Sequence, residues 1–265
     1  MNRIAEKFET LRKERRTALI PYISSGYPDL DTTRRFVLEL ERCGANIVEL
    51  GVPFSDPVAD GPTIQRASLR ALQQGTTLKG IVETVTAIRK DSRIPIALMT
   101  YYNPVLAFGV RKFCREAARA GVDGLIIPDL PPEEAGDLIA SCREQNIATV
   151  FLVAPTSSED RIAKIDSYTT GFLYCVSLTG VTGARTSMGE DVPVFMETVR
   201  SRSTHPLAIG FGISTPVQAY EAAKLADGII VGSAVINVIE QSETVEEMVT
   251  GVGEFTKSLR DGIDQ

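Results

Sequence analysis

Short apolar, β-branched segments alternate with longer segments of helical period along most of the chain. This alternation is typical of βαβ units around a parallel sheet. The predicted strands are residues 18–22, 47–50, 96–100, 124–127, 148–153, 172–176, 207–210 and 228–231. The predicted helices between them include residues 31–43, 63–74, 78–90, 109–120, 132–146 and 215–225. Eight such units predict an α/β fold of the (β/α)8 TIM-barrel type.

Length and segment composition favour one domain. The chain has 265 residues, 43% of them hydrophobic, which is enough for one closed barrel with a full core. No segment is rich enough in Gly, Ser or Pro to act as a linker, so we expect a single domain over residues 1–265. The charged segment "MNRIAEKFETLRKERR" precedes the first strand and predicts an extra N-terminal helix.

Composition narrows the possible partners. The net charge is -6, and the charged residues are scattered, which argues against a nucleic-acid surface or an anionic-membrane surface. The N-terminus has no apolar signal core, and no apolar run approaches the roughly 20 residues of a membrane span, so we expect a cytoplasmic protein. The four cysteines are interpreted as ordinary buried thiols: Cys43, Cys114, Cys142 and Cys175. A role in a functional site stays open for Cys175.

A faint internal repeat makes Glu49 exceptional. The segments "GANIVELG", "GVDGLIIPD" and "LADGIIVGS" share one turn-and-strand pattern, in which a small residue and Asn or Asp precede the strand. When the three are aligned, Ile126 and Ile230 occupy the position of Glu49. The fold therefore normally places an apolar side chain there, and an ionised Glu would need a partner, a proton or a polar ligand.

Other catalytic groups are scarce at the carboxyl ends of the predicted strands, where barrel enzymes keep their chemistry. Every lysine lies in a helical or flanking segment, so no Schiff-base lysine is predicted. The single histidine, His205, precedes the seventh strand at the opposite end and is interpreted as a surface turn residue. Zinc chemistry and His-based catalysis are therefore not expected, and no metal site is predicted.

Carboxylates remain as the candidates for catalysis. Glu49 ends the second strand, and Asp60 lies in the loop that follows. A Glu in an apolar pocket has a raised pKa, which suits proton transfer near neutral pH. Asp56, in the same loop, is interpreted as a turn-capping or interface residue. A lone acid in a strand is structural as often as catalytic, and the repeat and the neighbouring Asp60 favour catalysis here.

Two further patterns predict a ligand site. The segments "GFGIST" and "VGSAV" follow strands seven and eight, where glycine-rich loops and a helix N-terminus commonly hold a phosphate. Gly180 and Gly183, in the long loop after strand six, could hinge that loop over a bound ligand. A ring of aromatic and apolar side chains above the barrel would suit a planar apolar group: Tyr22, Met99, Tyr101, Tyr174 and Phe211.

The segment "ELGVPFSDPVADGP", followed in order by "GVTGAR", "GFGIS" and "VGSA", resembles the tryptophan synthase α subunit family over essentially the whole chain. The resemblance implies a (β/α)8 barrel that cleaves indole-3-glycerol phosphate to indole and glyceraldehyde 3-phosphate. This is a retro-aldol reaction without a cofactor.

The resemblance also assigns roles residue by residue. Glu49 would be the proton shuttle at indole C3, and Asp60 would accept the indole N–H bond and stabilise the cationic intermediate. Thr182, in "GVTGAR", matches the loop threonine that closes over the site and contacts Asp60. The expected phosphate ligands are backbone groups of Gly183, Gly212, Gly232 and Ser233. The expected indole pocket is formed by Tyr22, Met99, Tyr174 and Phe211; some family members have Phe at position 22.

The family acts with a β subunit that condenses indole with serine, using pyridoxal phosphate bound in β. The resemblance therefore implies an α2β2 complex, with no cofactor in this chain and indole passing between the active sites through a tunnel. The expected β-facing residues lie in the loops above the barrel: Pro53, Asp56, Pro57, Asn103, Pro104 and Asp129.

Three rival functions are considered. Indole-3-glycerol phosphate synthase shares the substrate and scaffold, but relies on strand-end lysines that this sequence lacks. A non-catalytic phosphate-binding activator of a partner enzyme is disfavoured by the presence of both Glu49 and Asp60. A free-standing indole-3-glycerol phosphate lyase stays open, because the loop sequences do not show whether a β subunit is required.

Overall fold

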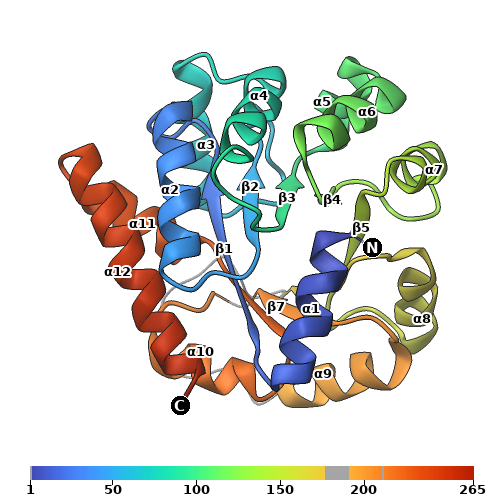
Figure 1. Ribbon diagram of the computed structural model, residues 1–265. Coiled ribbons are helices and arrows are strands. Elements are labelled where there is room, and N and C mark those ends of the chain that lie inside the picture. The colour runs from blue at the N-terminus through green and yellow to red at the C-terminus, as the bar shows by residue number, and fades with distance from the viewer. Residues whose placement is uncertain (1, 177–190, 211) are drawn as a thin grey trace.

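The strands form a closed parallel barrel, as predicted. The computed structural model describes residues 2–176, 191–210 and 212–265 (Figure 1). Neighbouring strands pair in sequence order from β1 to β8, and β8 pairs with β1. The strands are β1 (Ala18–Ser24), β2 (Val48–Gly51), β3 (Ile96–Met99), β4 (Gly124–Ile126), β5 (Ala148–Val153), β6 (Leu173–Val176), β7 (Leu207–Gly210) and β8 (Gly228–Val231).

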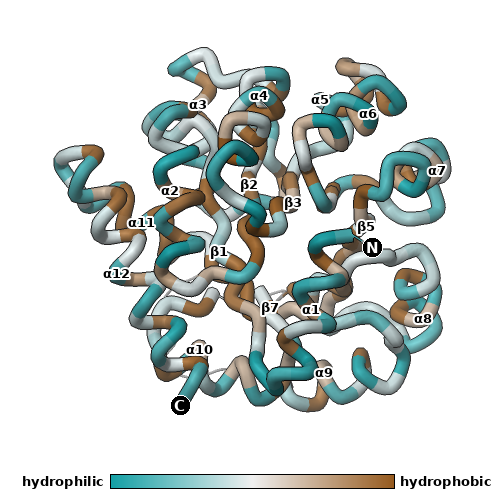
Figure 2. The backbone as a smooth tube through the Cα atoms, viewed as in Figure 1, coloured by the Kyte–Doolittle hydropathy of each residue, from teal (hydrophilic) through white to brown (hydrophobic). Residues whose placement is uncertain are grey.

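Helices surround the barrel in the described part of the chain, and their apolar sides face the strands (Figure 2). They are α1 (Arg3–Glu14), α2 (Leu30–Arg42), α3 (Pro62–Gln73), α4 (Leu78–Ile88), α5 (Tyr102–Phe108), α6 (Val110–Ala120), α7 (Gly136–Glu144), α8 (Glu159–Tyr168), α9 (Asp191–Arg202), α10 (Pro216–Ala223), α11 (Ser233–Gln241) and α12 (Val245–Ile263).

Side chains along each strand point alternately into the barrel and toward the helices, which gives two separate buried layers. Leu50, in β2, belongs to the larger cluster between strands and helices, whereas Ile47 belongs to the cluster inside the barrel. Ile126 and Ile230, the repeat partners of Glu49, also lie in the inner cluster. Successive side chains of a strand point to opposite faces, so Glu49 shares the inward side with Ile47.

The predicted N-terminal helix, α1, covers the amino-terminal end of the barrel. Ile4 and Phe8 are buried in the inner cluster, and the Phe8 ring lies 5.6 Å from that of Phe172. Asn2 caps the helix with its side chain, which accepts the Ile4 N–H, and its amide also donates to the carbonyl of Asp123. The inner cluster is therefore covered at this end, and the opposite end remains for a ligand.

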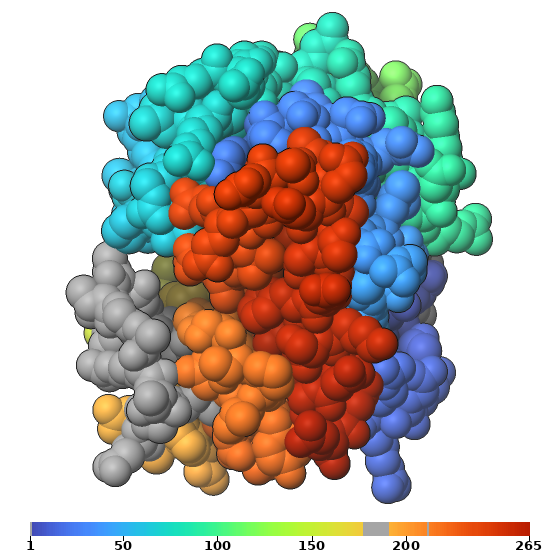
Figure 3. Space-filling view, turned by 90° about the vertical axis from the view of Figure 1, so that its left-hand side faces the viewer, coloured from blue at the N-terminus to red at the C-terminus, as the bar shows by residue number. Residues whose placement is uncertain are grey.

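The C-terminal helix, α12, supports the junction where the barrel closes. It packs against α2, α10 and α11, and Figure 3 shows this red segment at the surface between blue and orange segments. Arg260 is buried, and it donates to the carbonyl of Thr17 and to the side chain of Asn46. These contacts join the last helix to the turns before β1 and β2.

Two sequence predictions need correction at the element level. The helix predicted over residues 132–146 begins only at Gly136, because Glu134 and Ala135 donate their N–H groups to Pro131 and Pro132 in turns. Asn103 and Pro104, expected in a loop above the barrel, lie instead in the first turn of α5. The Asp129 carboxylate accepts the N–H of Tyr102 at 2.9 and 3.2 Å, so a cap from a distant loop allows this short helix to form.

Asp123 provides a test of this packing. Its carboxylate is 4% exposed and accepts hydrogen bonds from Arg3, Arg89 and the Ile96 N–H at 2.7–2.8 Å. Asp123→Ala would leave Arg89 largely buried and unpaired, so we expect a loss of about 3–5 kcal/mol in the free energy of unfolding, measured in urea. Glu221→Ala, which removes an exposed ion pair with Lys224, should cost less than about 1 kcal/mol. Equal losses would contradict this account.

Candidate active site

Glu49 is fully buried inside the barrel. It is 0% exposed, and neither carboxyl oxygen has a hydrogen-bond partner among the described residues. Burial, and secondarily the charge of Asp60, raises the pKa of Glu49 to about 8. The acid predicted from the repeat is therefore protonated near neutral pH, and its unpartnered oxygens are free to bind a ligand.

Asp60 lies in the half-buried loop between β2 and α3. Burial raises its pKa to about 6, while a hydrogen bond from the Tyr101 hydroxyl opposes the shift. That hydroxyl also accepts the N–H of Ala59 at 2.9 Å, and the Tyr101 ring stacks on Phe54 with centroids 5.2 Å apart. Tyr101 thus fixes the loop on both sides of the carboxylate. The sequence placed Tyr101 among the aromatic candidates but gave no sign of this anchoring role.

Tyr22 and Tyr174 share the electrostatic environment of the two acids. The pKa of each hydroxyl is raised well above its usual value, mainly by burial and then by the charges of Asp60 and Glu49. In the strand register Tyr22 pairs with Glu49. These four groups therefore lie close together at the carboxyl ends of the strands.

Glycines allow both tyrosine side chains to lie close to the backbone of a neighbouring strand. A Cβ atom added at Gly51 would lie 2.0 Å from the Tyr22 hydroxyl oxygen, and one added at Gly210 would lie 2.7 Å from Tyr174. Met99 ends β3 and packs against both the inner and the outer cluster. Three residues of the expected indole pocket thus come from β1, β3 and β6, namely Tyr22, Met99 and Tyr174.

The N-terminus of α11 lies beside Tyr22. Gly232 is the N-cap of α11, has no side-chain cap, and would bring an added Cβ atom to 3.6 Å from Tyr22. Ser233, the first helical residue, is exposed. Gly212 has a φ of +70°, a left-handed conformation that favours glycine, and no atom of the described residues, its chain neighbours aside, lies within 4 Å of a Cβ added there. The uncapped N–H groups of α11 are suited to an anion.

Three predicted site residues lie outside the described residues: Thr182, Gly183 and Phe211. Their expected roles stay predictions, as does the hinge predicted at Gly180 and Gly183.

The residues expected to face a partner divide by exposure. Asp56, Asn103 and Asp129 are exposed, and Pro57 and Pro104 are half-buried. Pro53 is buried within the chain, so it offers no surface here. Asp56 also accepts the Ser55 hydroxyl at 2.6 Å, and Asp129 caps α5, so both have local structural roles in addition to any contact with a partner.

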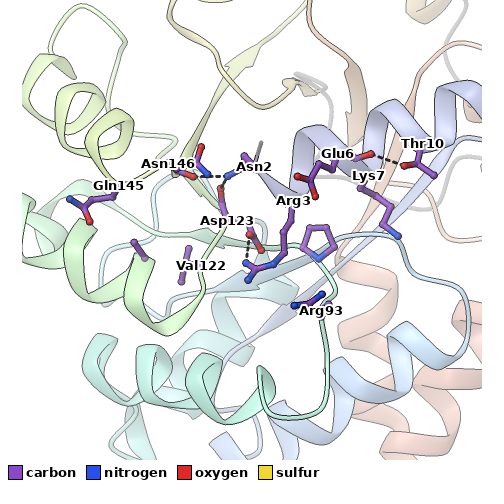
Figure 4. A pocket seen from close by; sticks show the side chains of 12 residues that line it. Asn2, Arg3, Glu6, Lys7, Thr10, Arg93, Val122, Asp123, Gln145 and Asn146 are labelled. Carbon is purple, nitrogen blue, oxygen red and sulfur yellow. Dashed lines mark hydrogen bonds and ion pairs between the residues drawn. The ribbon is translucent and has the colours of Figure 1, made fainter.

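His205 and a surface hollow both lie away from the carboxyl ends of the strands. His205 pairs through Nδ1 with Asp166 at 2.8 Å in the turn before β7, so it is anchored there. A hollow of about 560 Å³ lies at the opposite end, between α1 and the turns before β3, β4 and β5 (Figure 4). Arg3 and Asp123 form an ion pair in it. Among the described residues, no group of three His, Cys, Asp or Glu side chains could hold a metal ion.

The fold and site define a class. A parallel barrel with two perturbed acids and an uncapped helix N-terminus at the carboxyl ends of its strands is a (β/α)8-barrel enzyme that acts on a small ligand. The family model described as "Tryptophan synthase alpha chain" matches residues 8–264.

Similar proteins agree over the full length. The tryptophan synthase alpha chain of Roseiflexus sp. (strain RS-1) is 51% identical, over 98% of this chain and 100% of that protein. The one from Geotalea daltonii is 48% identical, over 99% of both chains. The solved alpha subunit from Legionella pneumophila has a TM-score of 0.92 at 36% identity, covering 100% of this chain and 99% of that one. This chain belongs to the tryptophan synthase alpha chain family.

The buried acid makes a prediction about stability. The folded-state pKa of Glu49, about 8, exceeds the unfolded value of 4.5, so the folded chain holds an extra proton between these values. Below pH 4.5, burial of the Glu49 carboxyl group costs little free energy of unfolding, because the group is protonated in both states. The cost grows as the pH rises from 4.5 to 8, because only the unfolded chain can release the proton there. We therefore compare the free energy of unfolding of Glu49→Gln with that of the wild type in denaturant at pH 5 and at pH 9. The difference should shift in favour of Glu49→Gln by about 3–4 kcal/mol from the lower to the higher pH.

The matched control is Glu254→Gln, at an exposed helical position. Its stability should differ from that of the wild type by the same small amount at both pH values. A pH-independent difference for Glu49→Gln would contradict a protonated Glu49.

Proposed function

We propose that this chain cleaves indole-3-glycerol phosphate with Glu49 and Asp60 as its two catalytic acids. Membership of the tryptophan synthase alpha chain family makes the chain a lyase of tryptophan biosynthesis, whose reaction releases indole and glyceraldehyde 3-phosphate. The observation that carries the assignment of the acids is a fully buried Glu49 near Asp60, with no hydrogen-bond partner for the Glu49 carboxyl group in the described part of the chain.

The reaction needs two proton transfers. A proton is added to indole C3, which places positive charge on the ring nitrogen. The hydroxyl group on the adjacent glycerol carbon then loses its proton, and the carbon–carbon bond breaks. Its electron pair returns to the ring, and the oxygen becomes the aldehyde oxygen. One group must therefore be an acid in the resting enzyme, and another must stabilise the cation.

The pKa values fit this division of labour. Glu49, with a pKa of about 8, holds a proton at neutral pH and can donate it to C3. Asp60, with a pKa of about 6, is mainly ionised at that pH and can accept the indole N–H bond as positive charge develops. After donation, the Glu49 carboxylate is a base in a low-dielectric site, and it can take the hydroxyl proton.

Substrate binding follows from the surrounding elements. We assign the phosphate to backbone groups at Gly212, Gly232 and Ser233, because α11 has no side-chain cap. The indole would lie against Tyr22, Tyr174 and Met99, whose side chains are buried or half-buried near Glu49. A ligand held at both ends would have its reacting carbon close to the two acids.

A β subunit is the expected partner, because the matched relatives are tryptophan synthase alpha chains. A chain of the solved tryptophan synthase from Mycobacterium tuberculosis also matches, with a TM-score of 0.91 at 37% identity, over 100% of this chain and 99% of that one. We propose an α2β2 complex in which pyridoxal phosphate is bound by β. The exposed Asp56, Asn103 and Asp129 would face that partner. No described helix is long and apolar enough to cross a membrane, and we propose a cytoplasmic location.

Turnover of indole-3-glycerol phosphate tests this proposal. Glu49→Gln keeps the size of the side chain but removes the acid, so indole release should fall by roughly 10²–10⁴-fold, and further if Glu49 serves both transfers. Asp56→Asn, on the exposed part of the same loop, should retain the rate of the isolated chain within about threefold, since the effect of an exposed surface substitution is small.

The assay is run with and without a β subunit. Wild-type turnover by Glu49→Gln would contradict the assigned mechanism. We expect a β subunit to raise the rate of cleavage; an unchanged rate on its addition would contradict activation by this partner and leave the assigned chemistry intact.

A further inference from the structure

Two cysteine thiols meet on the outside of the barrel, away from the proposed site. Cys114 on α6 and Cys142 on α7 have their Sγ atoms 3.8 Å apart. Both residues are 0% exposed, and they are separated by 28 residues in the sequence. This contact could not be predicted from the sequence, because no C-x-x-C motif brings the two cysteines together.

The surroundings of the pair are apolar. The helices α6 and α7 pack against each other, and both cysteines belong to the cluster between strands and helices, together with Phe113, Ala117 and Leu138. Glu49 lies on the other side of the sheet, inside the barrel. The mechanism above therefore makes no use of these thiols.

We propose that Cys114 and Cys142 form an oxidisable pair that closes into a disulfide between α6 and α7. With hydrogen peroxide as the oxidant, the thiolate of one cysteine attacks the peroxide, and the O–O bond breaks with release of water. The other thiol then attacks the resulting sulfenic acid and displaces a second water. Two thiols and one peroxide thus give one disulfide and two waters.

The two thiols contact each other directly, and either sulfur can donate a hydrogen bond to the other. The thiolate is the reactive form of cysteine, and the neighbouring thiol can stabilise it by donating a hydrogen bond, so whichever cysteine is oxidised first has its resolving thiol beside it. A disulfide has an S–S distance of about 2.05 Å, so the two sulfurs must approach each other from 3.8 Å for the bond to form.

The bond would constrain one segment of the barrel. The enclosed residues include β4 and Asp129, whose carboxylate caps α5. Closing a loop of this length restricts the unfolded chain, so the oxidised protein should be more stable than the reduced protein. Cleavage activity should be retained, because Glu49 lies in β2 and Asp60 in the loop before α3, so neither acid belongs to the two helices that the bond would join.

The experiment uses the full chain carrying Cys43→Ser and Cys175→Ala, which leaves only the proposed pair. After mild peroxide treatment, peptide mass spectrometry should show Cys114 joined to Cys142 in the monomer, and thiol titration should fall to zero. The melting temperature should rise by roughly 5 °C or more and return on reduction with dithiothreitol. The wild-type chain is analysed in parallel by the same peptide mapping, in case the variant folds poorly.

The matched control adds Cys142→Ala to the same background. It should form no internal disulfide, and Cys114 should instead accumulate as sulfenic or sulfinic acid. Two alkylatable thiols after peroxide treatment, a cross-link only between molecules, or an oxidised chain that melts no higher than the reduced one would overturn the proposal.

Discussion

A carboxyl group buried without a partner is the constraint on which this site depends. Taking an ionised carboxylate out of water costs several kcal/mol, and Glu49 lies inside the barrel with both oxygens unsatisfied by the described residues. The fold meets this cost by keeping the group protonated, with a pKa of about 8. The same arrangement that costs stability above neutral pH supplies an acid at neutral pH.

The surrounding structure keeps Glu49 shielded from water on one side and holds Asp60 near it. The interior below Glu49 is filled by apolar side chains and closed by α1, so a ligand can approach from the carboxyl ends of the strands. Tyr101 holds the neighbouring loop by bonding Ala59 and Asp60, which keeps a second acid of lower pKa nearby. Two carboxyl groups of different pKa allow one site to provide both an acid and an anion.

The sequence predicted much of this, and the reasons differ between parts. Periodicity predicts the barrel because strand and helix patterns are local, and the aligned repeat identified Glu49 as an acid in an apolar position. Long-range contacts have no such local signal. The Asp129 cap that forms α5, the Tyr101 anchor and the Cys114–Cys142 contact each join residues far apart in the chain or in different elements. The burial of Pro53 likewise depends on how the loop packs.

The protonation state of Glu49 is the central claim, and infrared difference spectroscopy can measure it directly. Spectra of the wild type minus Glu49→Gln, recorded from pH 5 to pH 10, isolate the carbonyl stretch of this one carboxylic acid. The account predicts that the band of the protonated acid persists at pH 7 and titrates away with a pKa of about 8. A carboxylate band already complete at pH 6 would contradict it.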